Sequence, residues 1–357
     1  MERNRTWATL KMESACSSRE YKRLFARLLA GGASLLFGFM VLAQGTNIYY
    51  AGFEPSEGFD TRLTLVGQGC ATDNQMCWVG TDTNGSGNGI VANYFDNTNS
   101  MLQPFGQQQA FVGFYPLTDT NGILNVWRPL NFDPLAAGLS VVTFSTTLAI
   151  YDSVATTNRD CFRWSIYNME ADPSRLFTLD FDNTTTGINY ELDDGIFVPT
   201  GFSFERGGEY DLTIILNFAD NLWSATLRGS ETTATPIVDS QPMSTQGSVL
   251  NLGDIDAVWV NRDIGVYGDN FMVFDNYSVA AEPYPVSLEV LEPGSNGAFR
   301  LALIGEPGRR YSIDVTSDFV DWFALATNNA GTDGGFDFVD TTSTGYTHSF
   351  YRARWVE

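Results

Sequence analysis

Acidic residues supply the most direct candidates for catalysis in this sequence. Hydrolysis of a glycosidic bond needs two positioned carboxylates. The segment Glu191–Ile196 approaches the pattern Glu-x-Asp-x-x-Glu, but isoleucine stands at the position of the last acid. Asp180 and Asp182 would share one face of a strand, because strand side chains alternate with a period of two. The sequence therefore predicts no complete catalytic site, and a divergent polysaccharide-degrading enzyme stays an alternative.

Two tryptophans are candidates for binding a sugar. The C–H face of a sugar ring stacks on an aromatic ring, while its hydroxyl groups form hydrogen bonds. Trp78 comes just before a Gly/Asn-rich segment, and Trp127 precedes an Arg-Pro pair, so both are flanked by residues typical of loops. Trp164, Trp223 and Trp259 lie in apolar runs and are expected in the core. We therefore predict Trp78 and Trp127 as ligand-binding residues.

Histidine-based metal sites are excluded, because His348 is the single histidine of the chain. We expect His348 to be an ordinary surface or edge-strand residue. The segment Asp82–Gly87 has the Asp-x-Asn-x-Ser-Gly spacing that begins an EF-hand calcium loop, but Asn93 stands where the bidentate glutamate should be. This segment is therefore expected to be a surface loop.

Cysteine spacing predicts one local disulfide. Cys70 and Cys77 bracket a short polar segment, and a bond between them would close a small loop. Cys161 lies between aromatic residues and is expected to be a buried free thiol. Pairing of Cys161 with Cys70 or Cys77 stays open, because connectivity cannot be read from sequence.

An apolar run from Leu28 to Ala43 follows Lys22, Arg23 and Arg27 and ends in small residues before Gln44. This layout predicts a secretory signal peptide over residues 1–43 and an exported, secreted or surface-displayed mature chain. A membrane anchor is the alternative, but the run is shorter than the roughly 20 apolar residues that a spanning helix needs. No later stretch is long enough to span a bilayer.

The charge balance restricts the partners. The chain has a net charge of −22, and both of its lysines, Lys11 and Lys22, lie in the expected signal peptide. Such a chain repels nucleic acid and anionic lipid, since both need cations to replace their counterions. It suits calcium and neutral sugars.

The sequence after Ala43 predicts strands and turns throughout. Runs rich in Val, Ile, Thr, Phe and Tyr are separated by clusters of Gly, Asn and Asp, and no segment has a sustained helical period. Many short strands with regular turn signals predict an all-β fold, a sandwich or jelly roll. The clearest expected strands are Val141 to Ile150, Phe162 to Tyr167, Leu176 to Phe181, Tyr210 to Phe218, Trp223 to Leu227, Ala257 to Val260 and Phe271 to Val279.

Two prolines in Glu282-Pro283-Tyr284-Pro285 predict a boundary, because proline lacks the ladder donor and stiffens the chain. We expect a large domain over residues 44–282, a linker over 283–286 and a small C-terminal β-sandwich over 287–357. Expected strands of the small domain are Ser287 to Leu291, Phe299 to Ile304, Tyr311 to Thr316, Trp322 to Ala326, Phe336 to Val339 and Phe350 to Trp355.

The C-terminal stretch resembles a module found at the ends of exported bacterial proteins. The matching residues are a Gly-Pro turn at Gly305–Gly308, the turn Ser317–Trp322 and the closing segment Phe350–Arg352. The resemblance covers residues 299–357 and implies export or surface display, with no particular reaction.

The large domain resembles the jelly-roll group of concanavalin-like lectins and carbohydrate-binding modules. The matches are Gly52-Phe53-Glu54 near its start and Asp269–Val279 near its end. In that group the opening and closing strands lie side by side, and their Glu and Asp coordinate a structural calcium ion. The resemblance thus implies Glu54 and Asp275 as calcium ligands, with a solvent-facing position for both as the alternative. Calcium takes six to eight oxygen ligands, so a carboxylate from each end would tie the first strand to the last.

Together these features predict a non-catalytic protein that binds a polysaccharide or cell-surface glycan or serves adhesion. The alternatives are the divergent polysaccharide-degrading enzyme and a structural envelope component without a small ligand.

Overall fold

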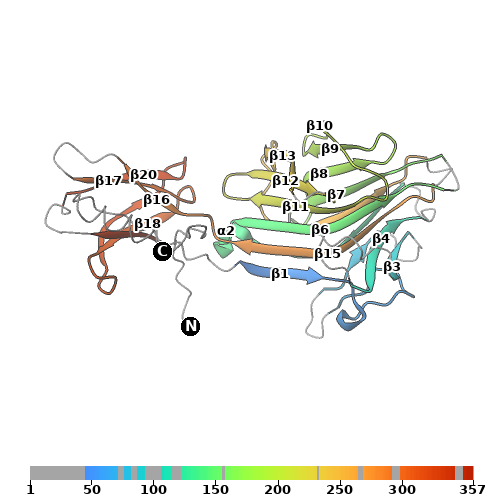
Figure 1. The fold of residues 1–357 in the computed structure, drawn as a ribbon, viewed down its shortest axis with the longest axis horizontal. Coiled ribbons are helices and arrows are strands. Elements are labelled where there is room, and N and C mark those ends of the chain that lie inside the picture. Colours follow the sequence, from blue (N-terminus) through green and yellow to red (C-terminus); the bar gives the residue numbers. More distant parts are fainter. Residues whose placement is uncertain are drawn as a thin grey trace, which may run out of the picture. The chain divides into compact units, whose positions relative to one another are not determined.

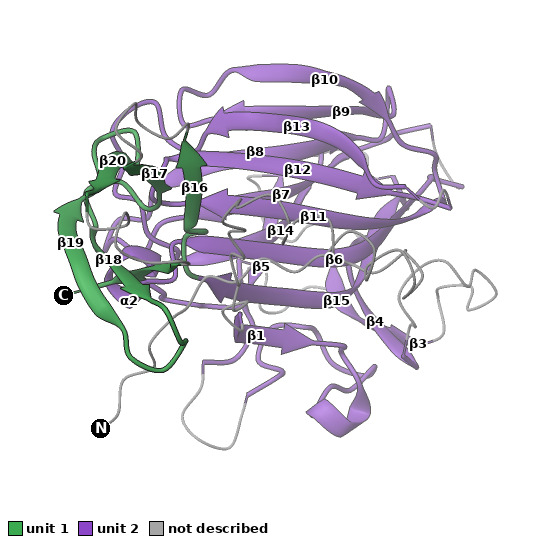
Figure 2. Cartoon of the chain, turned by 60° about the vertical axis from the view of Figure 1, so that its left-hand side comes forward, with its two compact units in different colours: residues 1–44, 283–357 green, residues 45–282 purple. Residues whose placement is uncertain are grey.

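The computed structural model describes residues 45–70, 76–81, 87–92, 106–114, 122–154, 157–230, 233–263, 268–291, 298–341 and 349–356. The predicted signal peptide, most of the segment Asp82–Gly87, Asn93 and His348 lie outside the described residues. The chain divides between Glu282 and Pro283 into two compact units, which Figure 2 colours separately. No helix among the described residues is long and apolar enough to cross a membrane.

The large unit, residues 45–282, is a jelly-roll β-sandwich made of two antiparallel sheets (Figure 1). Sheet A has the strand order β13-β12-β11-β6-β15-β4-β3, and β1 also pairs with β15. Its strands are β1 (Thr46–Ala51), β3 (Asn88–Ala92), β4 (Gln108–Gly113), β6 (Val141–Tyr151), β11 (Glu209–Asn217), β12 (Leu222–Arg228), β13 (Thr235–Pro242) and β15 (Phe271–Glu282).

Sheet B has the strand order β10-β9-β8-β7-β14-β5-β2. Two short helical turns, η1 (Pro55–Glu57) and α2 (Pro134–Ala137), connect strands of the large unit. The strands of sheet B are β2 (Val79–Gly80), β5 (Ile123–Trp127), β7 (Cys161–Tyr167), β8 (Arg175–Asp182), β9 (Gly187–Leu192), β10 (Phe197–Ser203) and β14 (Asp254–Val260).

The core lies between the two sheets because alternate residues of each strand face inward. In β11, Leu212, Ile214 and Leu216 are buried in this core, which turns Asp211 and Thr213 to the outer face of sheet A. Fully buried aromatic rings dominate the core, and each contributes roughly 1.5–3 kcal/mol of burial free energy. These rings include Phe53, Trp78, Phe144, Trp164, Phe274 and Tyr277.

Strand β15 is buried on both faces at Phe271–Phe274, as its continuous apolar run predicts. Met272 and Phe274 belong to the central core, whereas Phe271 and Val273 pack with Ala149 in a second apolar cluster. The strand therefore has no free face at this point.

A bulge interrupts β15 immediately after Asp275. Asp275 pairs with Thr147 of β6, but the next pair joins Ser278 to Ser145, so β15 has one extra residue here. Asn276 has a φ of 52°, in the left-handed region that non-glycine residues seldom adopt. The bulge lets Tyr277 enter the core while Asp275 and Asn276 stay on the outer side of sheet A.

The C-terminal unit is a small β-sandwich with two three-stranded antiparallel sheets, β16-β17-β20 and β19-β18-β21. A separate core joins them, built around Leu301, Leu303, Tyr311, Ile313 and Tyr351. The strands are β16 (Ser287–Leu291), β17 (Phe299–Ile304), β18 (Arg310–Thr316), β19 (Phe323–Asn329), β20 (Gly335–Asp340) and β21 (Phe350–Trp355).

Candidate functional site

A groove of about 590 Å³ crosses the outer face of sheet A. The register of five strands places polar residues in a row across it, since Thr226, Thr213, Ser145, Ser278 and Tyr50 are successive cross-strand partners. The row runs from β12 through β11, β6 and β15 to β1. Because neighbouring strands lie about 4.8 Å apart, five strands span roughly 19 Å.

A second row beside the first carries the charged groups of the groove. Arg228, Asp211 and Thr147 are successive partners across β12, β11 and β6, and the row continues to Asp275 of β15. The Asp211 carboxylate forms an ion pair with Arg228, and the Thr147 hydroxyl donates to its Oδ1 at 2.8 Å. These three side chains hold one another in place, so the carboxylate and the guanidinium are fixed before a ligand arrives.

Tyr50 closes the β1 end of the groove. Its side chain is 47% exposed, and its hydroxyl donates to Asn276 Oδ1 at 2.8 Å. Burial and the negative charges of Asp275, Glu57 and Glu54 raise the pKa of the phenol, so it stays protonated at neutral pH. An exposed ring with a fixed hydroxyl is suited to stacking against the face of a sugar.

Asp275 lies next to Asn276 and is completely buried. Its Oδ1 accepts the Asn276 N–H at 2.6 Å. Burial, followed by the negative charges of Glu54 and Glu57, raises the pKa of the Asp275 carboxyl to about 7, although N–H groups of Asn276 and Gly106 oppose the shift. A buried carboxylate in this setting requires a proton or a cation to offset its charge.

Glu54 binds the start of β4 and the residue before it, next to Gly106. Its Oε1 accepts the N–H of Gln107 at 2.6 Å and that of Gln108 at 3.4 Å. A Cβ atom at Gly106 would overlap the Glu54 carboxylate, so glycine lets this carboxylate lie against the backbone here. The structure therefore places Glu54 and Asp275 beside the segment that leads into β4. That both bind one calcium ion stays a prediction.

Glu57 fixes the turn that carries Glu54. Its Oε2 accepts the N–H of Gly52 at 2.9 Å and that of Glu54 at 3.2 Å. Phe53 between them has a φ of 54° and a fully buried ring, which anchors the turn in the core. The turn after β1 is thus held at both ends, and Glu54 is aimed at the start of β4.

One oxygen of the Asp275 carboxylate is available for a cation, because Oδ2 is buried and has no hydrogen-bond partner in the structure. The amide oxygen Gln108 Oε1 is likewise buried and without a partner. Three or more His, Cys, Asp or Glu side chains arranged to hold a metal ion do not occur among the described residues. Calcium also accepts amide and backbone oxygens, so the two carboxylates would supply part of its six to eight oxygen ligands.

The two predicted sugar-binding tryptophans have different positions. Trp78 is 1% exposed, donates its indole N–H to the Tyr49 hydroxyl at 3.0 Å and packs against Phe53 and Tyr277. It belongs to the core, contrary to the prediction from its neighbours in the sequence. Trp127 is half-buried at the end of β5 on the outer face of sheet B, because Leu124 and Val126 of this strand face inward.

Cys70 and Cys77 form a disulfide. Cys161 is a buried free thiol that contacts the Arg262 guanidinium, with Arg262 Nη2 at 2.9 Å from its Sγ. Burial, together with the charge of Asp180, raises the pKa of this thiol to about 11. The Cys161 thiol is therefore protonated and unreactive at neutral pH.

The acids considered for catalysis are engaged in structural contacts on sheet B. Glu191 pairs with Arg175 at 2.5 Å, and Asp180 pairs with Arg163 at 2.7 Å. Asp193 accepts hydrogen bonds from residues 244–246 and fixes that turn. Asp182 pairs with Arg262 and caps residues 184–185.

The comparisons with known proteins give a likeness of fold. No protein-family model and no curated protein matches the chain. Among solved structures, a carbohydrate esterase of the Shiga toxin-encoding bacteriophage phi24B has 11% identity and a TM-score of 0.39, covering 67% of this chain and 99% of its own. Arcelin-5, a lectin-like defence protein of Phaseolus vulgaris, has 9% identity and a TM-score of 0.38 with the same coverages.

A sialidase has 11% identity and a TM-score of 0.34 over 50% of this chain. The chain spans only 15% of the length of that sialidase.

Proposed function

We propose that the chain is an exported protein that binds a neutral glycan in the groove of sheet A. The observation that carries this proposal is the pair of cross-strand rows, which bring hydroxyl groups, one ion pair and the exposed Tyr50 ring to a single hollow. Sugars present a C–H face for an aromatic ring and hydroxyl groups that both donate and accept hydrogen bonds. The groove offers a partner for each.

The Asp211–Arg228 pair would make the most directional contacts. The carboxylate accepts a hydrogen bond from one sugar hydroxyl, and the guanidinium donates to a neighbouring oxygen. Because the two charges cancel, the groove itself does not attract an ion. The net charge of −22 on the chain disfavours an anionic polysaccharide, which makes a neutral glycan the better ligand.

The lining of the groove favours binding over hydrolysis. Of the described residues that line it, Asp211 is the one carboxylate. Glycoside hydrolysis uses two carboxyl groups that flank the scissile bond. Asp211 is moreover paired with Arg228, so its geometry suits a fixed hydrogen-bond acceptor.

Calcium at Glu54 and Asp275 is part of the same proposal. The bound ion would neutralise both carboxylates and use Asp275 Oδ2, an acceptor oxygen without a hydrogen-bond partner. Asn276 follows Asp275 directly and holds the Tyr50 hydroxyl. Neutralising the carboxylates would therefore also fix the Tyr50 end of the groove.

A glycan array of neutral and acidic polysaccharides, probed with the chain from Gln44 onward in the presence of calcium, tests the proposal. We expect signal on neutral glycans. Tyr50→Ala and the double variant Asp211→Asn/Arg228→Gln should each lower the affinity at least tenfold. Arg300→Gln, which removes an exposed ion pair of the C-terminal unit, is the matched control and should leave the affinity unchanged.

Absence of signal on every glycan would overturn the proposal. That result would favour a structural envelope component without a small ligand. Cleavage of a bound polysaccharide, measured as new reducing ends, would favour the hydrolase alternative.

A further inference from the structure

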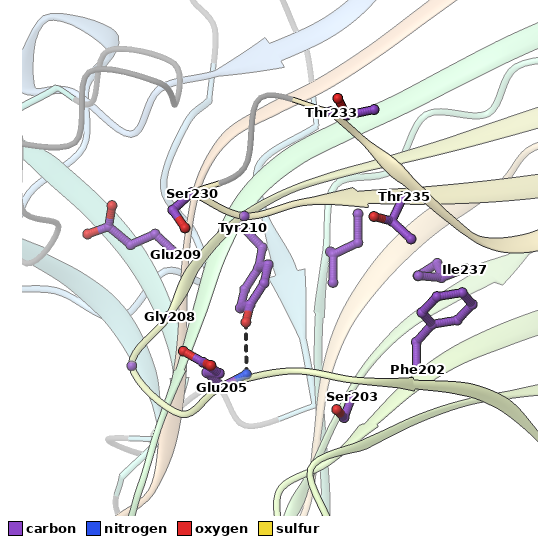
Figure 3. Close-up of a pocket in the computed structure, with 13 residues that line it drawn as sticks. Phe202, Ser203, Glu205, Gly208, Glu209, Tyr210, Ser230, Thr233, Thr235 and Ile237 are labelled. Carbon is purple, nitrogen blue, oxygen red and sulfur yellow. Dashed lines mark hydrogen bonds between the residues drawn. The ribbon is translucent and has the colours of Figure 1, made fainter.

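A second hollow, of about 610 Å³, opens between the edges of the two sheets beside β10 and β13. Figure 3 shows Tyr210 and Glu205 on one side of it and Phe202 with Ile237 on the other. The remaining lining residues include Ser203, Glu209, Leu227, Ser230, Thr233 and Thr235.

This hollow adjoins the groove of sheet A. Consecutive residues line the two hollows in three places: Tyr210 next to Asp211, Gly229 next to Arg228 and Thr233 next to Ala234. Successive side chains of a strand face opposite sides of the sheet. Tyr210 and Asp211 therefore face opposite sides of sheet A, and the two hollows lie on either side of the sheet, next to each other at Arg228–Gly229 and at Thr233–Ala234.

Tyr210 is the central residue of the second hollow. Cβ atoms at Gly208 and Gly229 would lie 3.0 and 3.1 Å from its ring, so the two glycines keep both edges of the ring clear. Its hydroxyl accepts the Glu205 N–H at 2.8 Å, as Figure 3 shows. The hydroxyl hydrogen is left to donate, and burial raises the pKa of the phenol, so that hydrogen stays bound at neutral pH.

The lining repeats the chemistry of the groove. Two aromatic rings, Phe202 and Tyr210, stand beside hydroxyl groups and the carboxylates of Glu205 and Glu209. Phe202 is 40% exposed, so its ring can contact a ligand. Among the described residues of the lining there is no Lys, Arg or His, which excludes an anionic sugar and admits a neutral one.

We propose that this hollow is a second sugar-binding subsite, reached from the groove around the edge of sheet A at Gly229 and Ala234. The ligand is then an extended neutral polysaccharide chain that occupies both hollows, not a single terminal sugar. This inference rests on glycan binding in the groove. The span of the five strands, roughly 19 Å, already exceeds one sugar ring and supports a chain lying across them.

Isothermal titration calorimetry with short and long cello- and laminari-oligosaccharides, disaccharides and hexasaccharides of each, tests the subsite. The wild-type protein should bind the hexasaccharide of one series more tightly than its disaccharide. Tyr210→Phe keeps the ring and removes only the hydroxyl, and Glu205→Gln removes one charge. Each should lower hexasaccharide affinity about fivefold, the effect of one lost hydrogen bond, and leave disaccharide affinity unchanged.

Glu289→Gln, at an exposed position of β16, is the matched control for Glu205→Gln and should change neither affinity. Equal affinities for the two chain lengths, or a hexasaccharide affinity that Tyr210→Phe and Glu205→Gln do not change, would overturn the second subsite. If Tyr50→Ala still lowers affinity in that case, glycan binding in the groove stands. Absence of binding in both series, or binding that Tyr50→Ala does not weaken, would overturn the proposed function itself.

Discussion

Glu54 and Asp275 lie against the same segment: Glu54 Oε1 accepts the Gln107 N–H at 2.6 Å, and the N–H of the preceding residue, Gly106, acts against the raised pKa of the Asp275 carboxyl. Two carboxylates from opposite ends of the large unit thereby meet at the start of β4. Their charges repel: burial is the main cause of the raised pKa of Asp275, and the negative charge of Glu54 adds to it. A cation bound between the two carboxylates would offset this repulsion.

Removal of calcium is expected to destabilise the protein. An ion that binds only the folded state stabilises it by roughly 2.7 kcal/mol at a hundredfold excess over Kd. EDTA should therefore lower the melting temperature at pH 7, and millimolar calcium should restore it. Glu54→Ala and Asp275→Ala should abolish most of this response. Asp82→Ala is the control, because its segment lacks the twelfth-position acid. A melting curve that EDTA leaves unchanged would contradict the calcium site.

Gly106→Ala is expected to displace Glu54. The new Cβ atom would overlap the Glu54 carboxylate, which must then leave the Gln107 and Gln108 N–H groups. Loss of these hydrogen bonds should cost about 1–3 kcal/mol in the free energy of unfolding, measured by urea denaturation with calcium present. Gly45→Ala is the matched control, since its Cβ would meet only an ordinary contact at 3.7 Å, and it should change stability by less than about 0.5 kcal/mol.

A pair of acids on sheet B should make stability fall as pH rises. Burial raises the pKa of Asp254 to about 6, and burial with the neighbouring Asp254 charge raises that of Asp256 well above its usual range. The folded state therefore binds protons that the unfolded state has lost above about pH 4. The stabilisation is complete below pH 4 and disappears as pH rises through 6.

Asp256→Asn should flatten this pH dependence. The amide keeps the shape of the side chain. In the wild-type protein the Asn125 side-chain N–H donates to Asp256 Oδ2 at 2.9 Å, and the amide oxygen of the variant can accept the same hydrogen bond. Melting temperatures of the wild-type and variant proteins from pH 4 to pH 8, at constant calcium, would measure the difference. The variant should gain stability relative to the wild type toward pH 8, and parallel curves would show that the pair does not titrate in this range.

Loss of the Cys70–Cys77 disulfide should cost about 2 kcal/mol, because the bond closes a short loop. The double variant Cys70→Ser/Cys77→Ser should show this loss in chemical denaturation. Cys161→Ser measures the separate effect of the buried thiol. An equal effect of a reducing agent on the wild type and the double variant would indicate that the bond does not form.

Much of the fold follows from alternation of apolar residues, which is a local property. The expected strand from Val141 to Ile150 matches β6 (Val141–Tyr151), and those at Phe299 to Ile304 and Phe350 to Trp355 match β17 and β21. Strand β10 (Phe197–Ser203) was not predicted, since it is an exposed edge strand without an apolar face. The sequence therefore predicts a strand where alternate residues are apolar and one face of the strand is buried.

The site depends on register, which sequence does not show. Polar residues alternate with apolar ones along β12, which is typical of a half-exposed strand, but only pairing with β11 places Arg228 opposite Asp211. Trp78 comes just before a Gly/Asn-rich segment in the sequence, yet the packing of Phe53 and Tyr277 around it encloses the ring. That the first and last strands of the large unit lie side by side was implied only by a resemblance, because the β15 bulge has no local signature.

The pairing of β1 with β15 has a consequence for how the large unit folds. These are the first and last strands of the unit, and Thr46 lies opposite Ala281. Strand β15 also lies between β6 and β4, so sheet A stays divided until the end of the unit has been synthesised. Contacts of such long sequence separation form slowly. A nascent chain that stops before β15 would expose the unpaired edge of β6 and part of the aromatic core, which makes this interval the one most open to aggregation or proteolysis.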